Sequence, residues 1–247
     1  MYQFEICANS VESCLAASEG GADRVELCAG IPEGGTTPSY GTIKAARDLP
    51  DIRLHVIIRP RGGDFIYSPT EIRTMKEDIR MAKDCSVDGV VFGCLTPDGE
   101  VDIPVMRGLM KVASGLSVTF HRAFDHCADP HKALNDIISL GCHRVLTSGQ
   151  QPTAEKGIPL LKELVVQAGR KIIIMPGCGV NEKNIARIAR ETGAREFHFS
   201  AREEFESPAR YVNSHIYMGS RDTEEWTRTA TTSRKVREVI QGLQSNY

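Results

Sequence analysis

Residues 3–28 read QFEICANSVESCLAASEGGADRVELC. The stretch opens with a short run in which apolar and polar residues alternate, and it closes on a second run of the same kind. The segment between them has helical periodicity and ends at Gly20, a residue suited to the position just past a helix. Alternation with period two is typical of a strand, so the stretch predicts a β-α-β unit.

The same unit recurs along the whole chain. Strand-like runs fall at 3–7, 24–28, 53–59, 89–94, 116–121, 144–148, 171–176 and 196–200. Helical periodicity is present near 10–20, 39–48, 69–85, 103–114, 130–140, 154–168, 181–192 and 232–244. Strict alternation of strands and helices predicts a parallel sheet.

Two arrangements of such a sheet compete, a closed barrel and an open, doubly wound sheet. No G-x-G-x-x-G motif follows the first strand, and the alternation has no break at its midpoint. We therefore predict an α/β fold, a TIM (β/α)8 barrel that forms a single domain over 1–247. A long loop at 201–231 precedes the closing helix, and we expect it to cover the barrel mouth or to meet a neighbouring subunit.

The composition limits the classes of function. The formal net charge of −2 and the lack of a basic stripe make nucleic acid an unexpected partner. No run approaches the roughly 18 to 20 apolar residues of a membrane span. The chain also opens without a positively charged leader, so we expect no membrane partner and a cytoplasmic location. The eight cysteines include no C-x-x-C pair, which favours reduced thiols, most of them in the core.

Several strands place polar residues on the face that would point into the barrel. The charged and imidazole-bearing ones are Glu5, Glu26, His55, Arg59 and His198. Buried charge is costly unless it is paired. One interpretation is a structural network in which Glu5, Glu26 and Arg59 neutralise one another. The other is that those nearest the strand ends take part in function, and the sequence leaves both open.

The C-terminal ends of the strands and the loops after them carry function in this fold. Gly177 and Gly179 allow a ligand to approach backbone amides, and a helix predicted to begin near Asn181 directs its positive end there. The other residues that we expect to bind a phosphate or carboxylate are Arg59, Arg61, Asp64, Arg122, Thr147, Ser148 and Ser200. Alternatively, the glycines only allow a sharp turn, and the arginines pair with Asp64 and Asp125.

Two cysteines suggest a metal site. Cys7 and Cys28 end adjacent predicted strands at matching positions, each two residues after a glutamate. Neighbouring strands lie about 4.8 Å apart, so the two sulfurs can share one ion. Two thiolates favour Cu(I), or Zn(II) with help from histidine. Two core cysteines, a disulfide or a catalytic thiolate explain the same residues.

One histidine at a strand end is a candidate for proton transfer. His121 lies beside Arg122 and Asp125, which makes His121 and Asp125 candidate catalytic residues. The alternative is a hydrogen-bonded histidine that only shapes the mouth.

These residues lie in segments that resemble the CutC family of copper homeostasis proteins. The matching segments are EICANS at 5–10, GADRVELC at 21–28, EGGTTPS at 33–39, IRPRGGDF at 58–65, TFHRAFD at 119–125, RVLTSG at 144–149, PGCGV at 176–180 and EFHFSAR at 196–202. The resemblance implies a cytosolic, usually oligomeric TIM barrel that binds copper. Cys7 and Cys28 match the family's proposed Cu(I) ligands.

Three hypotheses of function follow. The first is a cytosolic copper homeostasis protein that binds Cu(I) through cysteines at the barrel mouth. The second is an enzyme that acts on a phosphorylated or carboxylated small molecule bound by Arg59, Arg61, Arg122 and the 177–179 turn. The third is an interaction protein with its 202–231 segment at a subunit contact. The expected partners are a copper ion or a small anionic molecule, and further copies of the chain in a homodimer or larger homo-oligomer.

Overall fold

The first unit of the chain forms as the sequence predicts. In the computed structural model, β1 (Gln3–Ala8) leads into α1 (Val11–Glu19), and β2 (Arg24–Leu27) follows. The hydroxyl of Ser10 caps α1 by accepting a hydrogen bond from the backbone of Ser13, which satisfies one of the free amides at the helix start. The structure describes residues 2–49, 51–213, 215–216 and 226–244.

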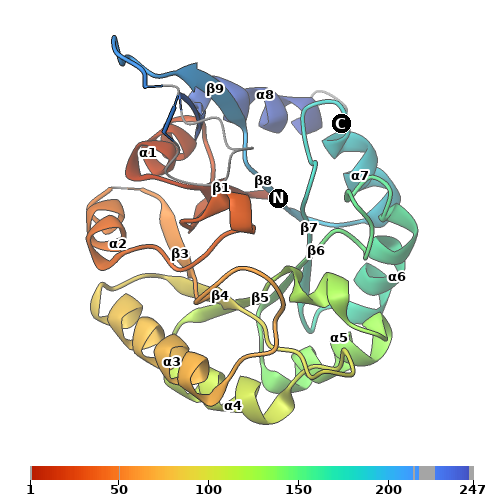
Figure 1. Cartoon of the computed structure of the whole chain (residues 1–247). Coiled ribbons are helices and arrows are strands. Elements are labelled where there is room, and N and C mark those ends of the chain that lie inside the picture. Colours follow the sequence, from red (N-terminus) through yellow and green to blue (C-terminus); the bar gives the residue numbers. More distant parts are fainter. Residues whose placement is uncertain (1, 50, 214, 217–225, 245–247) are drawn as a thin grey trace.

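The other elements continue the alternation around a ring (Figure 1). They are η1 (Ile31–Glu33), α2 (Tyr40–Arg47), β3 (Arg53–Ile57), α3 (Pro69–Asp84), β4 (Gly89–Phe92), α4 (Ile103–Val112), β5 (Ser117–Phe120), η2 (Arg122–His126), α5 (Pro130–Leu140), β6 (Arg144–Thr147), α6 (Ile158–Ala168), β7 (Ile173–Pro176), α7 (Ile185–Thr192), β8 (Glu196–Phe199), β9 (Arg202–Glu206), β10 (Thr227–Thr231) and α8 (Ser233–Gln244).

The parallel strands form a nearly closed barrel, which confirms the predicted TIM-barrel fold. The sheet has eight strands in the order β7-β6-β5-β4-β3-β2-β1-β8, and β7 and β8 lie side by side where the ring closes. The outward-facing residues, such as Ile6, Val25 and Leu27, are buried beneath the surrounding helices. This layer is the main hydrophobic core, and it fixes the strand ends that form the mouth. Among the described residues, no helix is long and apolar enough to cross a membrane.

Two segments differ from their predicted form. The helix expected from Asn181 begins at Ile185, because the amide side chain of Asn184 holds a turn by bonding the backbone of Asn181 and Gly179. The connection at 201–231, expected to be a loop, contains an antiparallel ribbon in which β9 pairs with β10. Both ribbon strands are largely exposed, and the ribbon projects from the barrel beside α1 and α8 (Figure 1). Residues 214 and 217–225 of this connection lie outside the described part of the chain.

Candidate functional site

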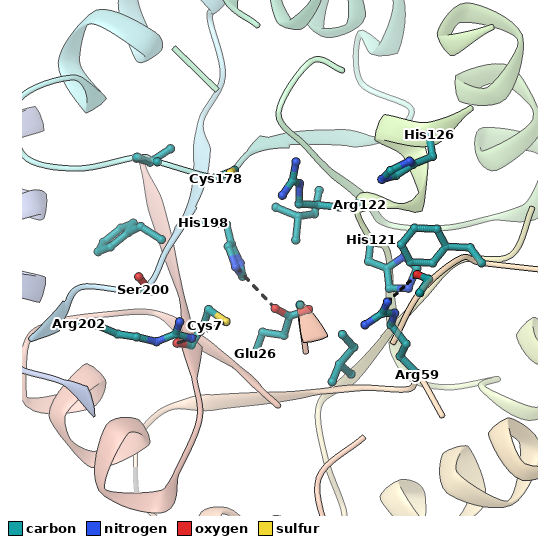
Figure 2. Close-up of a pocket in the computed structure, with 18 residues that line it drawn as sticks. Cys7, Glu26, Arg59, His121, Arg122, His126, Cys178, His198, Ser200 and Arg202 are labelled. Atoms are coloured by element: carbon teal, nitrogen blue, oxygen red, sulfur yellow. Dashed lines mark hydrogen bonds and ion pairs between the residues drawn. The ribbon is translucent and has the colours of Figure 1, made fainter. Parts of the chain in front are cut away.

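A cavity of about 480 Å³ opens among the C-terminal ends of the barrel strands (Figure 2). Its polar lining comes from Cys7, Glu26, Arg59, His121, Arg122, His126, Cys178, His198, Ser200 and Arg202. The volume is within the range of roughly 300–1,000 Å³ that holds small organic molecules. One wall carries the thiol of Cys7 with Glu26 and His198, and the opposite wall carries Arg59 and His121.

The two cysteines predicted to share a metal do meet. The sulfurs of Cys7 and Cys28 lie 3.6 Å apart, and both thiols are free. Their positions on the strands are not matched, however, because Cys7 stands level with Glu26 in the ladder and Cys28 lies two residues further on. The strands of a barrel are tilted and shifted along one another. Two residues at the ends of neighbouring strands are therefore not, in general, hydrogen-bonded partners across the sheet.

A histidine and a carboxylate complete the group around Cys7. One ligand atom each from Cys7, Glu26 and His198 lie within 4.8 Å of one another. Nε2 of His198 is 3.6 Å from a carboxylate oxygen of Glu26, and its Nδ1 is 2.8 Å from Glu5. Arg202, the first residue of β9, approaches the sulfur of Cys7 to 3.3 Å. Arg202 was not among the predicted site residues, although it ends the matching segment EFHFSAR, because it lies beyond the predicted strand at 196–200.

Electrostatics make the two thiols unlike each other. The hydrogen bond with Cys28 lowers the pKa of Cys7 well below its ordinary value, against the effect of burial, and His198 and Arg202 lower it further. The same contact and burial raise the pKa of Cys28. Burial raises the pKa of Glu26 to about 8. Burial opposes a charged His198, but its contacts with Cys7 and Glu5 raise its pKa well above the ordinary value.

A buried network of charged residues lies beneath this group. Arg24 forms ion pairs with Glu5 and, at 2.8 Å, with Glu196. Arg144 also pairs with Glu196 at 2.7 Å. Burial alone would raise the pKa of Glu5, but Arg24 and then His198 lower it well below its usual range. Glu5 therefore stays ionised, and it holds His198 in place beside Cys7.

This network corrects the predicted one. One of the two open interpretations paired Arg59 with Glu5 and Glu26, but its guanidinium donates to the backbone carbonyls of Glu33, Gly35 and Gly63. Arg24, Arg144 and Glu196, like Arg202, are residues that sequence reasoning missed. Their signal was present, because Arg24 shares the inward face of β2 with Glu26.

His121 lies in the opposite wall of the cavity. Its Nδ1 accepts a hydrogen bond of 3.2 Å from the backbone of Ala123 at the start of η2, and the ring is buried. Burial, with the nearby charge of Arg59, lowers the pKa of His121 to about 3, so the ring is neutral. His55 lies deeper in the barrel, and burial lowers its pKa to about 3 as well.

Asp125 lies behind the cavity wall and organises other predicted site residues. Its carboxylate accepts hydrogen bonds from the side chains of Thr147 and Ser148 and pairs with Arg122 at 2.8 Å. With both oxygens engaged, Asp125 is placed to position Arg122. Thr147 and Ser148 are fully buried, and neither is part of the lining.

The remaining predicted anion-binding residues divide into two groups. Gly179 and Ser200 line the cavity, whereas Arg61, Asp64 and Gly177 do not. Arg61 is partly exposed and pairs with Asp64 at 3.0 Å and with Glu71 at 2.6 Å. A side chain at Gly177 would place its Cβ 2.5 Å from Cδ1 of Leu146, so a larger residue here requires the Leu146 side chain to shift.

Comparisons with known proteins agree with this architecture. The model of the CutC family matches residues 2–203. The chain belongs to the CutC family. A CutC family protein of Bacteroides thetaiotaomicron is 67% identical over 246 residues, which cover 99% of each chain. The human copper homeostasis protein cutC homolog is 48% identical over 237 residues, 96% of this chain and 87% of the human one.

A solved CutC structure shares the fold. The crystal structure of CutC from Streptococcus agalactiae superposes with a TM-score of 0.78 at 36% identity, and it covers 81% of this chain and 99% of its own. These likenesses confirm the family that the motifs EICANS and GADRVELC indicated, and they place Cys7 and Cys28 in a CutC barrel.

Proposed function

We propose that this CutC protein binds Cu(I) through Cys7 and Cys28 and serves copper homeostasis in the cytoplasm. The observation that carries the proposal is the 3.6 Å separation of the two sulfurs, of which that of Cys7 lines the cavity and that of Cys28 is buried behind it. This distance is less than twice a metal–sulfur bond of about 2.3 Å, so one ion can contact both. Soft thiolates select Cu(I) over harder divalent ions, and the human relative's name points to the same metal.

The surroundings of the thiols support uptake of an ion. Cys7 supplies a thiolate, while Cys28 gives up its proton when the metal binds. Arg202 and the imidazolium of His198 offset the negative charge of two thiolates bound to a single monovalent ion. Glu5 fixes His198 from below, in the manner of an outer partner that orients a metal site.

Competition titration with a Cu(I) chelator under anaerobic conditions tests the proposal. Wild type is expected to take up one Cu(I) per chain. Loss of an outer partner typically weakens a metal site by about 10–100-fold, so Cys7→Ser and Cys28→Ser are each expected to weaken it by more than about 100-fold. Cys85→Ser removes a thiol at the end of α3 and is the matched control. Equal affinities in wild type and a Cys7→Ser/Cys28→Ser double variant would refute the proposal.

The size of the cavity favours a second candidate function. A single ion needs far less than 480 Å³, and the lining includes Arg59, His121 and Arg122 in addition to the residues around Cys7. The second candidate is an enzyme that acts on a phosphorylated or carboxylated small molecule, with His121 at the substrate and Asp125 holding Arg122. A panel of such molecules tests this candidate, with turnover followed by NMR. At least one of them is expected to be converted by wild type and not by His121→Ala. A panel without any turnover counts against it.

A further inference from the structure

One buried cation in the cavity wall has no carboxylate partner. Arg59 is 5% exposed, and its guanidinium donates hydrogen bonds of 2.7, 2.8 and 2.9 Å to backbone carbonyls. Within the described part of the chain, no Asp or Glu oxygen lies within 4.0 Å of it to form an ion pair. Arg24, equally buried, has two carboxylates. An uncompensated buried charge is unfavourable, so this wall favours an anion.

A buried hydrogen-bond donor lies in the same wall. Since Nδ1 of the neutral His121 ring accepts the Ala123 amide, the ring proton is on Nε2. This Nε2 is buried and has no hydrogen-bond partner among the described residues. A buried donor without an acceptor is costly, whereas an oxygen atom of a ligand in the cavity would satisfy it.

Phe65 holds these two groups together. Its ring lies 4.9 Å from the ring of His121, and the guanidinium carbon of Arg59 lies 5.2 Å from its centroid. Arg122 lines the same cavity and is oriented by Asp125 at 2.8 Å and by Ser148 at 3.1 Å. The donor and the two cations are therefore held by packing and hydrogen bonds before any ligand arrives (Figure 2).

We infer that Arg59, His121 and Arg122 form a subsite for the oxyanion of a small organic molecule, a phosphate monoester or a carboxylate. His121 Nε2 donates to an anion oxygen, and the two guanidinium groups offset its charge. The rest of the cavity holds the body of the ligand and leads to the thiol wall. This inference rests on the second candidate function for the choice of cavity, but it requires binding only, without turnover.

Binding of three probes by isothermal titration calorimetry at fixed ionic strength tests the subsite. Inorganic phosphate, phenyl phosphate and benzoate separate the contribution of the anion from that of the organic body. His121→Asn keeps an acceptor for the Ala123 amide and removes the Nε2 donor. His143→Asn is the matched control, because His143 Nδ1 also accepts a backbone amide, that of Val118 at 3.0 Å, away from the cavity lining.

Wild type and His143→Asn are expected to bind at least one probe equally, and His121→Asn to bind it about tenfold or more weakly. If His121→Asn does not fold, Arg122→Gln is expected to show the same loss. A Cys7→Ser/Cys28→Ser variant is expected to retain the binding, since the subsite lies in the other wall. The inference is overturned if no probe binds wild type saturably, if His143→Asn loses as much as His121→Asn, or if the thiol variant alone loses binding. Probe binding together with a substrate panel that shows no turnover counts against the enzyme and leaves the subsite standing.

Discussion

Cu(I) affinity is expected to rise about tenfold for each unit of pH between 6 and 8. Only deprotonated thiols bind the metal. Cys28 and the charges of His198 and Arg202 keep Cys7 a thiolate, whereas the raised pKa of Cys28 keeps its proton in place across this range. Uptake therefore displaces one proton, and each proton displaced changes the affinity tenfold per pH unit. Two thiols with ordinary pKa values near 8.5 would displace nearly two protons at neutral pH, a change approaching 100-fold per unit.

The assay is the chelator competition repeated at pH 6, 7 and 8, with the chelator's own protonation taken into account. His198→Gln serves as a second sample, because a coordinating imidazole must also lose its proton. If His198 remains an imidazolium beside the bound ion, wild type keeps a slope of one proton. A dependence close to 100-fold per unit that persists in His198→Gln, or no dependence in wild type, would refute the assignment of one thiolate and one thiol.

Two further predictions concern stability. Arg24→Met removes the guanidinium that Glu5 and Glu196 share and leaves each with a single cation, His198 and Arg144 respectively. It is expected to lower the free energy of unfolding by about 3–5 kcal/mol in urea titration, against less than about 1 kcal/mol for Arg187→Met in an exposed pair, and equal losses would contradict this. Gly177→Ala brings a Cβ within 2.5 Å of Leu146 and is expected to cost about 1–3 kcal/mol, measured as a lower Tm, and an unchanged Tm would show that the turn adjusts freely.

The barrel was predictable because hydrophobic periodicity is a local signal. Alternation within β1 and β2 identifies each strand and its inward face without any knowledge of its neighbours. The ribbon was not predictable in this way. β9 reads REEFE, and its exposed residues carry no apolar side to mark a strand. Alternation of apolar and polar residues arises where one face of a strand is buried, and this ribbon is largely exposed.

The sequence predicted which residues line the candidate site better than it predicted their hydrogen-bond and ion-pair partners. Cys7, Arg59 and His121 line the cavity as expected from their strand ends. The partner of each depends on the stagger between strands and on loop conformation, which no spacing in the sequence reveals. For this reason the sequence left open a pairing of Arg59 with the glutamates, whereas the loops around Arg59 supply carbonyls instead, and the sequence did not indicate Arg24 as the partner of Glu5.

The ion pairs at the floor of the barrel also bear on how this protein can evolve. Arg24 and Arg144 share Glu196, and Arg24 shares Glu5 with His198. A substitution at one of these positions leaves a neighbouring buried charge without one of its partners. The effect of the substitution on stability therefore depends on which residues occupy the other positions. We expect the residues of these ion pairs to be substituted together or not at all. Because Glu5 also holds His198 beside Cys7, their substitution would then be coupled to that of the residues around Cys7.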